Sequence, residues 1–122
     1  MTIRRHSPWG GILHEAVVHQ GVVYCGGIVA EDTSLDMAGQ ARDVFAQLDA
    51  LLAANGSDKE HVLSVLIFIA DNAERDAFNA VWKEYFAPAH LPARAGVGVD
   101  LGPGVKVEIV VTAAVIRDNE VD

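Results

Sequence analysis

Short strand-like and longer helix-like hydrophobic patterns alternate along this chain. The strand-like runs are rich in Val and Ile and lie at 12–19, 22–29, 62–69, 93–99 and 105–116. The helix-like stretches, at 35–54 and about 73–86, repeat apolar side chains every three or four positions, which places them on one helical face. The resulting order, β-β-α-β-α-β-β, predicts an α+β sandwich, a mixed sheet with two helices on one face.

Local polar residues predict where the two helices begin and end. Thr33 or Ser34 is expected to cap the start of the first helix, and Gly56 follows it where a C′ glycine belongs. Asp71 or Asn72 is expected to cap the second helix.

Two helices on one face leave the other face of the sheet uncovered. The chain is 51% hydrophobic, so the uncovered face is expected to keep many apolar side chains. Exposed apolar surface of this extent usually marks association, and we expect copies of the chain to pair through it. The 122 residues fit one domain spanning 1–122.

The composition excludes several classes of protein. The net charge of −8, from 17 acidic and 9 basic side chains, argues against a nucleic-acid partner. The single cysteine permits no intramolecular disulfide and favours a reducing, cytoplasmic setting. The longest uncharged apolar stretch, 62–70, falls well short of the about 20 residues that cross a membrane. The histidines and glycines show no metal-pair or phosphate-loop spacing, so neither a metal site nor a nucleotide-phosphate site is expected.

Two charged residues interrupt the apolar strands near the end of the chain. Strand alternation places Arg94 on one face with Gly96 and Gly98, which leaves space beside its guanidinium for a carboxylate ligand. Glu108 lies within the run 105–112 and needs a partner or a function there. A plain ion pair between Arg94 and Glu108, within one chain or across a subunit interface, is an equally good interpretation.

The same region contains a sequence motif that resembles one of a known family. Pro92-Ala93-Arg94, followed by Val105-Lys106-Val107-Glu108-Ile109, resembles the C-terminal motif of the Rid family, also called the YjgF family. Three further segments are similar to that family: Tyr24-Cys25-Gly26-Gly27-Ile28, Gln40-Ala41-Arg42 and Phe78-Asn79-Ala80-Val81-Trp82. The resemblance covers nearly the whole chain, in order and spacing.

The resemblance implies a fold and an assembly. The fold is like that of Bacillus chorismate mutase, in which the last strand lies inside the sheet and does not pair with the strand before it. Family members are typically homotrimers whose sheets face inwards, with a ligand cleft at each subunit interface.

The resemblance also implies a reaction, the hydrolytic deamination of enamines and imines such as 2-aminoacrylate to 2-keto acids and ammonia. The chain would then be a deaminase of the 2-iminobutanoate/2-iminopropanoate type, with no cofactor. Arg94 would bind the substrate carboxylate with the Gly96 N–H as a second donor, and Glu108 would assist the attacking water. The other residues of the implied binding site are Ile12, Cys25, Gly26, Asn79 and Trp82.

Three of these positions depart from the family pattern. Cys25 stands where the deaminases usually have Ser, Gly96 where they often have Cys, and Ile12 where Tyr is common. A lone thiol such as Cys25 is more often a small buried hydrophobe than a nucleophile. The missing side chain at Gly96 is expected to admit a bulkier or differently shaped imino acid.

Two other functions are compatible with the same residues. A non-catalytic, regulatory trimer that binds small carboxylates would need the arginine but not the lost hydroxyl groups. Ribonuclease or translation-inhibitor activity occurs among relatives, and the charge of −8 argues against it here.

Overall fold

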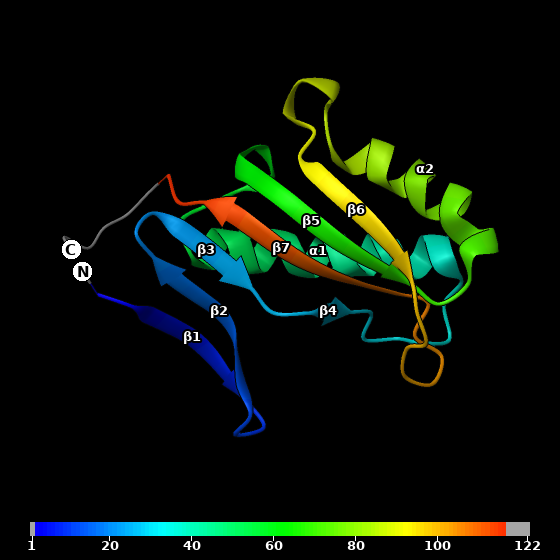
Figure 1. Cartoon of the computed structure of the whole chain (residues 1–122), viewed down its shortest axis with the longest axis horizontal. Coiled ribbons are helices and arrows are strands. Elements are labelled where there is room, and N and C mark those ends of the chain that lie inside the picture. Colours follow the sequence, from blue (N-terminus) through cyan, green and yellow to red (C-terminus); the bar gives the residue numbers. More distant parts are fainter. Residues whose placement is uncertain (1, 117–122) are drawn as a thin grey trace.

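The computed structural model describes residues 2–116, which form one sheet and two main helices (Figure 1). The strands are β1 (Arg4–Trp9), β2 (Leu13–His19), β3 (Val22–Cys25), β4 (Ile28–Val29), β5 (Val62–Ile69), β6 (Ala93–Gly98) and β7 (Val107–Ala114). The helices are α1 (Met37–Ala54) and α2 (Arg75–Tyr85), with single 3-10 turns η1 (Lys59–His61), η2 (Asn72–Glu74) and η3 (Pro88–His90).

The order of the strands confirms the inner position of the last strand. The sheet runs β1-β2-β3-β7-β5-β6, and β4 also pairs with β7. β7 is therefore flanked by β3 and β5, both antiparallel to it, while β5 and β6 form the parallel pair. The connection from β6 to β7 steps over β5, so these two strands do not form a hairpin.

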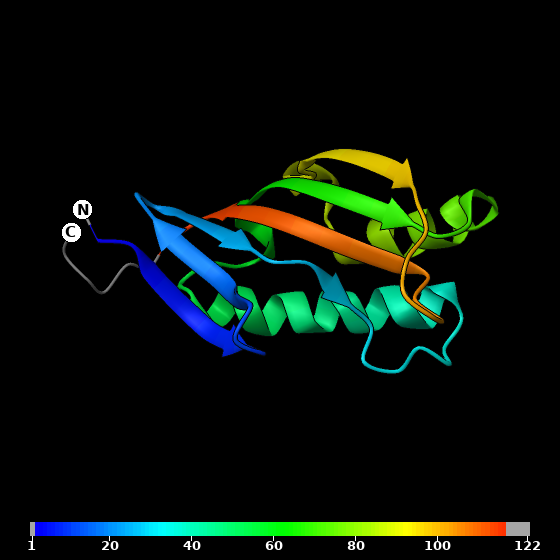
Figure 2. The ribbon, with the colours of Figure 1, turned by 60° about the horizontal axis from the view of Figure 1, so that its bottom comes forward.

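Both helices pack on the same face of the sheet (Figure 2). Alternate residues of β5 and β7 point towards them and are fully or nearly fully buried. Phe45 of α1 contacts the rings of Phe78, Trp82 and Phe86 in and after α2, with centroids 6.0 to 6.2 Å apart. This aromatic cluster joins the two helices and is the core that the periodicity of the helices predicts. Within residues 2–116, no helix is long and apolar enough to span a membrane.

The opposite face has no helix over it and is called the open face below. Tyr24, Leu66 and Val97 belong to it, and they are 51%, 37% and 42% exposed. Its other side chains come from the alternate positions of β5, β6 and β7: Ser64, Phe68, Ala95, Glu108, Val110 and Thr112. The expected uncovered apolar face is therefore present in the single chain.

The N-terminal segment differs from the sequence prediction. The sequence pattern predicts no strand before residue 12, but residues 4–9 form β1, which pairs with β2 from Arg4↔Val18 to Trp9↔Leu13. This strand lies at the edge of the sheet, where charged side chains reach water, so its sequence lacks the apolar alternation of the other strands.

Of the two predictions for the ends of α1, one is wrong and one is correct. Asp36, and not Thr33 or Ser34, caps α1 by accepting a hydrogen bond from Gly39 N at 2.9 Å. Gly56 follows α1 with a φ of 76°, as a C′ glycine does.

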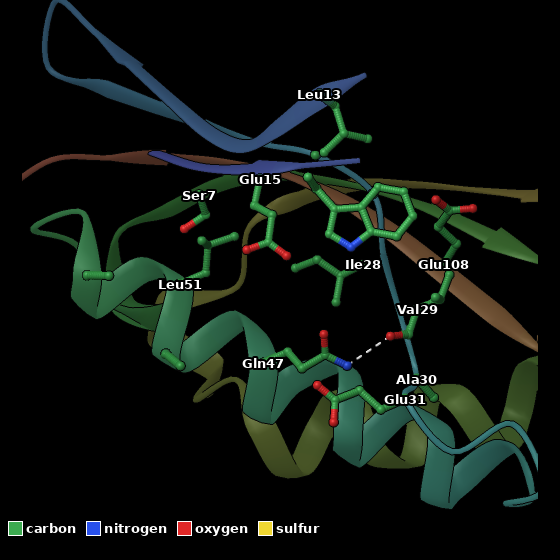
Figure 3. A pocket seen from close by; sticks show the side chains of 15 residues that line it. Ser7, Leu13, Glu15, Ile28, Val29, Ala30, Glu31, Gln47, Leu51 and Glu108 are labelled. Carbon is green, nitrogen blue, oxygen red and sulfur yellow. Dashed lines mark hydrogen bonds between the residues drawn. The ribbon is translucent and has the colours of Figure 1, made fainter. Parts of the chain in front are cut away.

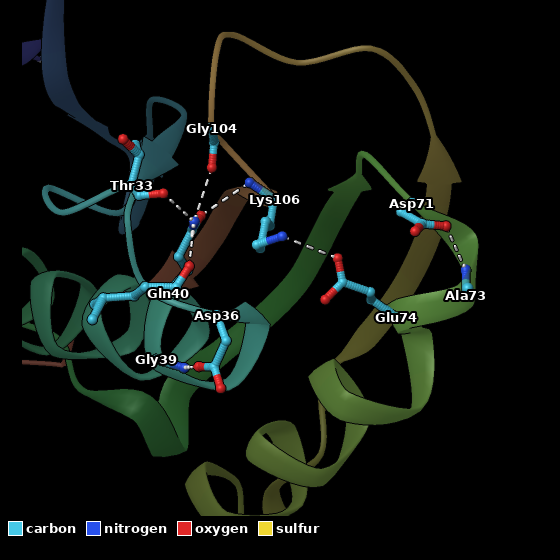
Figure 4. A network of polar contacts seen from close by, with 10 residues as sticks. Thr33, Asp36, Gly39, Gln40, Asp71, Ala73, Glu74, Gly104 and Lys106 are labelled. Atoms are coloured by element: carbon cyan, nitrogen blue, oxygen red, sulfur yellow. Dashed lines mark hydrogen bonds and ion pairs between the residues drawn. The ribbon is translucent and has the colours of Figure 1, made fainter.

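Gln40 is a fully buried amide that ties together the chain around the start of α1 (Figure 4). Its Nε2 donates to the carbonyl oxygens of Thr33, Leu35 and Gly104 at 3.2, 3.0 and 2.9 Å. Its Oε1 accepts from Lys106 N at 2.9 Å. One side chain therefore joins the loop before α1 to the segment that leads into β7.

We expect Gln40→Ala to lower the free energy of unfolding by about 3 kcal/mol, because it leaves several backbone groups without partners. Urea denaturation followed by circular dichroism measures this loss. Gln47→Ala is the control, since the half-buried Gln47 makes one backbone hydrogen bond, to Val29 O at 2.8 Å. We expect Gln47→Ala to lower the free energy of unfolding by about 1 kcal/mol. Equal losses for the two variants would contradict the role given to Gln40.

Candidate functional site

Six of the eight residues predicted for the site fall into two separate places. Asn79, Trp82, Arg94 and Gly96 lie where α2 packs against β6, and are called the α2–β6 group. Glu108 and Gly26 line a hollow on another part of the molecule. Within one chain, the two places are not in contact.

Arg94 is held against α2 by its guanidinium. Its Nη2 donates to Asn79 Oδ1 at 2.6 Å. Its Cζ lies 4.6 Å from the Trp82 ring centroid and 5.9 Å from that of Phe78, both within cation–π range. The α2–β6 group therefore fixes a cation in place, while the other N–H groups of Arg94 have no partner among residues 2–116 and can bind an anion.

The space beside Arg94 is not empty, which corrects the expectation drawn from the two glycines. The Arg75 guanidinium lies over Gly96: a Cβ there would stand 2.8 Å from Arg75 Nη1. Gly98 is covered in the same way by the Asn72 side chain. Burial lowers the pKa of the Arg94 guanidinium, and the neighbouring charge of Arg75 lowers it further.

The backbone of β6 adds donors at the same edge. β6 is the last strand of the sheet beside β5, and Val99 N donates to Ile69 O at 3.0 Å. Alternate residues of a strand in a parallel pair bond to the same neighbour, so the N–H groups of Arg94, Gly96 and Gly98 point away from β5. The Gly96 N–H therefore lies at the free edge of the described sheet, where the resemblance requires a donor.

Glu108 lies on the open face, on the side of the sheet opposite Arg94. It pairs with Phe68 of β5 and Val29 of β4, and within residues 2–116 its half-buried carboxylate has no hydrogen-bond or ion-pair partner. A Cβ at Gly27 would overlap this carboxylate, so a side chain there would force the Glu108 carboxylate to move. An ion pair between Arg94 and Glu108 of the same chain is therefore ruled out by the sheet between them.

Glu108 and Gly26 line a hollow of about 640 Å³ between the β1–β2 hairpin, β4 and α1 (Figure 3). Trp9, Leu13 and Ile28 give it apolar walls, and it has no basic side chain. Its remaining lining residues are Ser7, Glu15, Gly27, Val29, Ala30, Glu31, Gln47, Ala50, Leu51 and Ala54.

Cys25 and Ile12 have no direct part in this hollow. Cys25 is buried in the core, and burial raises the pKa of its thiol to about 11. The thiol is therefore neutral at pH 7, as a small buried hydrophobe would be. Ile12 is 75% exposed and lies in the turn between β1 and β2.

Comparison with known proteins agrees with the fold and with the sequence signature. The family model described as "Endoribonuclease L-PSP" matches residues 5–115. The chain is 37% identical over 115 residues to a RutC family protein of Haemophilus influenzae, covering 93% of this chain and 98% of that protein. The structure of a YjgF family member from Neisseria meningitidis has a TM-score of 0.91 at 37% identity, covering 97% of this chain and 98% of that one.

The chain belongs to the YjgF/Rid family. A second relative, the RutC family protein YoaB of Escherichia coli, is 36% identical over 102 residues, which cover 83% of this chain and 89% of that protein. The family membership and the fold class drawn from the sequence are both confirmed.

Two residues that contact the candidate site of this YjgF/Rid chain could not be predicted from its sequence. Gly27 was grouped with Gly26 but not assigned to Glu108, because the contact depends on the pairing of β4 with β7. Arg75 was missed because it follows Asn72–Glu74, a polar stretch that looks like an exposed helix start. Asp71 caps that 3-10 turn, so α2 itself begins only at Arg75.

No cluster of three or more His, Cys, Asp or Glu side chains that could hold a metal ion occurs in the part of the chain that the structure describes.

The candidate site consists of two parts, the sheet edge with Arg75 and Arg94 and a separate glutamate, Glu108, on the open face.

Proposed function

We propose that this chain hydrolyses 2-imino acids and their enamine tautomers to 2-keto acids and ammonia. Water adds to the imine carbon to form a carbinolamine, a proton moves to nitrogen, and the C–N bond breaks to release ammonia. The reaction needs no redox partner, since a protonated imine is already an electrophile. Membership of the family supports the general class, and the substrate is part of the proposal.

The observation that carries the proposal is the environment of the Arg94 guanidinium. The guanidinium is held by Asn79 and Trp82 and has no carboxylate partner within residues 2–116. A guanidinium presents a planar set of donors that matches a carboxylate, and the outward N–H of Gly96 lies two residues further along the strand. Arg94 would anchor the carboxylate that every 2-imino acid carries.

Glu108 is the proposed acid–base group. Its carboxylate has no partner in residues 2–116 and lies among apolar side chains of the open face, such as Phe68 and Val97. It would take a proton from the attacking water and return it to the leaving nitrogen. Because Arg94 and Glu108 of one chain face opposite sides of the sheet, they can act together only across a contact between copies.

The proposed assembly is a homotrimer with a cleft at each interface. The apolar open face supports association, since Tyr24, Leu66 and Val97 are all exposed in the protomer. The proposed partner is a small imino or keto acid, with no nucleic acid or membrane, and the proposed location is the cytoplasm.

Glu108→Gln tests the assignment, because it removes the proton acceptor but keeps the size of the side chain. We expect kcat for imine hydrolysis to fall about 100-fold, while the Kd for a 2-keto acid changes less than about threefold. Imines are generated in the cuvette by an amino-acid oxidase, and release of ammonia and keto acid is followed. Glu60→Gln, an exposed carboxylate in η1, is the matched control and should keep the wild-type rate.

A second function, binding of small carboxylates without turnover, is favoured by the neutral, buried thiol at Cys25, where the deaminases usually have a hydroxyl group. It predicts that wild-type protein binds 2-keto acids but does not accelerate imine hydrolysis above the uncatalysed rate. That result would overturn the catalytic proposal and leave the binding function standing.

A further inference from the structure

Two guanidinium groups lie side by side at the free edge of the sheet. Arg94 belongs to β6, and Arg75 is the first residue of α2, which packs on the same face of that strand. The proposed chemistry requires one of them, because a 2-imino acid needs only one carboxylate anchor. The second guanidinium has no assigned role.

Arg75 is held in a defined position. Its Nε donates to Asn72 Oδ1 at 3.0 Å, and its Nη2 lies 3.4 Å from the carbonyl oxygen of Gly96. Only the lack of a side chain at Gly96 permits this arrangement, because a Cβ there would stand 2.8 Å from Nη1. Nη1 makes no hydrogen bond within residues 2–116 and is free to bind a ligand.

The two positive charges have no acidic partner among residues 2–116. Neither Arg75 nor Arg94 forms an ion pair within residues 2–116, although the whole chain carries a net charge of −8. Arg42, by contrast, pairs with Glu84 at 3.1 Å. Two adjacent guanidinium groups repel each other, so an anion with two charges relieves more unfavourable energy here than an anion with one.

The spacing between the two arginine positions suits a ligand with two separate acidic groups. Arg94 and Gly96, over which Arg75 lies, are two residues apart on an extended strand, roughly 7 Å. On α2, Arg75 and Asn79, which holds Arg94, are four residues apart and so one turn from each other. Each guanidinium also donates one hydrogen bond to an asparagine side chain, Arg75 to Asn72 and Arg94 to Asn79. The N–H groups that remain for a ligand therefore differ between the two arginines.

We propose that this site selects imino acids that carry a second acidic group, with Arg94 binding the carboxylate beside the imine and Arg75 binding the distal one. The part of this proposal that concerns turnover rests on the proposed function. The part that concerns binding of the diacid is independent of it.

Isothermal titration calorimetry on the wild-type protein tests the binding part. We expect 2-oxoglutarate, a keto diacid, to bind about tenfold or more tightly than 2-oxobutanoate, a keto monoacid. Arg75→Gln should abolish this preference while changing the Kd for 2-oxobutanoate less than about threefold, and Arg75→Lys should keep part of it. Lys83→Gln removes the same charge two turns along α2 and is expected to keep the full preference.

The outcomes separate this inference from the proposed function. Equal affinity for the two keto acids, or a loss of affinity for both in Arg75→Gln, would overturn the inference whether or not imines are hydrolysed. Arg75-dependent binding of the diacid without any imine turnover would support the inference on the ligand and refute the deaminase proposal. Imines from acidic and neutral amino acids, made by matching oxidases, then show whether the preference extends to kcat/KM.

Discussion

Arg94→Ala is expected to lower kcat/KM for imine hydrolysis by about 1,000-fold. The substitution removes the only charged group proposed to anchor the carboxylate beside the imine, and with it the charge-assisted hydrogen bonds that orient the substrate. It also leaves Asn79 Oδ1 without the donor that it has at 2.6 Å in the protein. The measurement is ammonia release from several imines generated in the cuvette, over a range of oxidase activities.

Two further variants separate lost binding from lost structure. Arg94→Lys keeps the charge but cannot form two parallel hydrogen bonds or stack on Trp82 in the same way, so we expect partial activity. Arg42→Ala is the control: it removes an exposed arginine whose ion pair with Glu84 lies outside the proposed site. Its activity should match wild type, and thermal melts of all three variants should show a folded protein.

A folded Arg94→Ala protein with wild-type kcat/KM for every imine would refute the anchor role. Selective loss for some imines only would instead mean that the remaining substrates are held by other donors, such as the Gly96 N–H at the edge of β6.

The sequence predicts best those elements whose side chains are buried on a regular pattern. β5 was predicted at its observed bounds, because a run of β-branched and aromatic residues is stable only inside the sheet. β1 was missed because it is an edge strand with charged residues and Pro8, and nothing in its local pattern distinguishes it from a loop. Its place in the sheet is decided by pairing with β2 and not by its own periodicity.

The candidate site was predicted as a set of residues but not as an arrangement. Arg94 and Glu108 stand out as charges within apolar strands, and the sequence identifies them for that reason. Their opposite faces could not be derived, because the apolar side of β6, formed by Ala93, Ala95 and Val97, lies on the open face and not against the helices. The register of β6 against β5 supplies the missing information, and with it the position of Arg75.

Leu66→Glu on the open face is expected to abolish both assembly and activity. Leu66 lies near the middle of β5, between Ala95 of β6 and Val110 of β7, and is 37% exposed in the protomer. A glutamate there meets water in the isolated chain, so the fold should survive. In the proposed trimer it would place an unpaired charge within an apolar interface in every subunit, which costs several kcal/mol per charge.

Light scattering coupled to size-exclusion chromatography measures the assembly, and the imine assay measures activity on the same fractions. Leu35→Glu is the matched control, since Leu35 is also 37% exposed but lies in the loop before α1, away from the open face. We expect Leu35→Glu to remain trimeric and active, and Leu66→Glu to be a folded, inactive monomer. Because Arg94 and Glu108 face opposite sides of one sheet, loss of the interface should remove activity even though both residues stay in place. An active Leu66→Glu monomer would show that a single chain completes the reaction, and the site would then have to be built around the α2–β6 group alone.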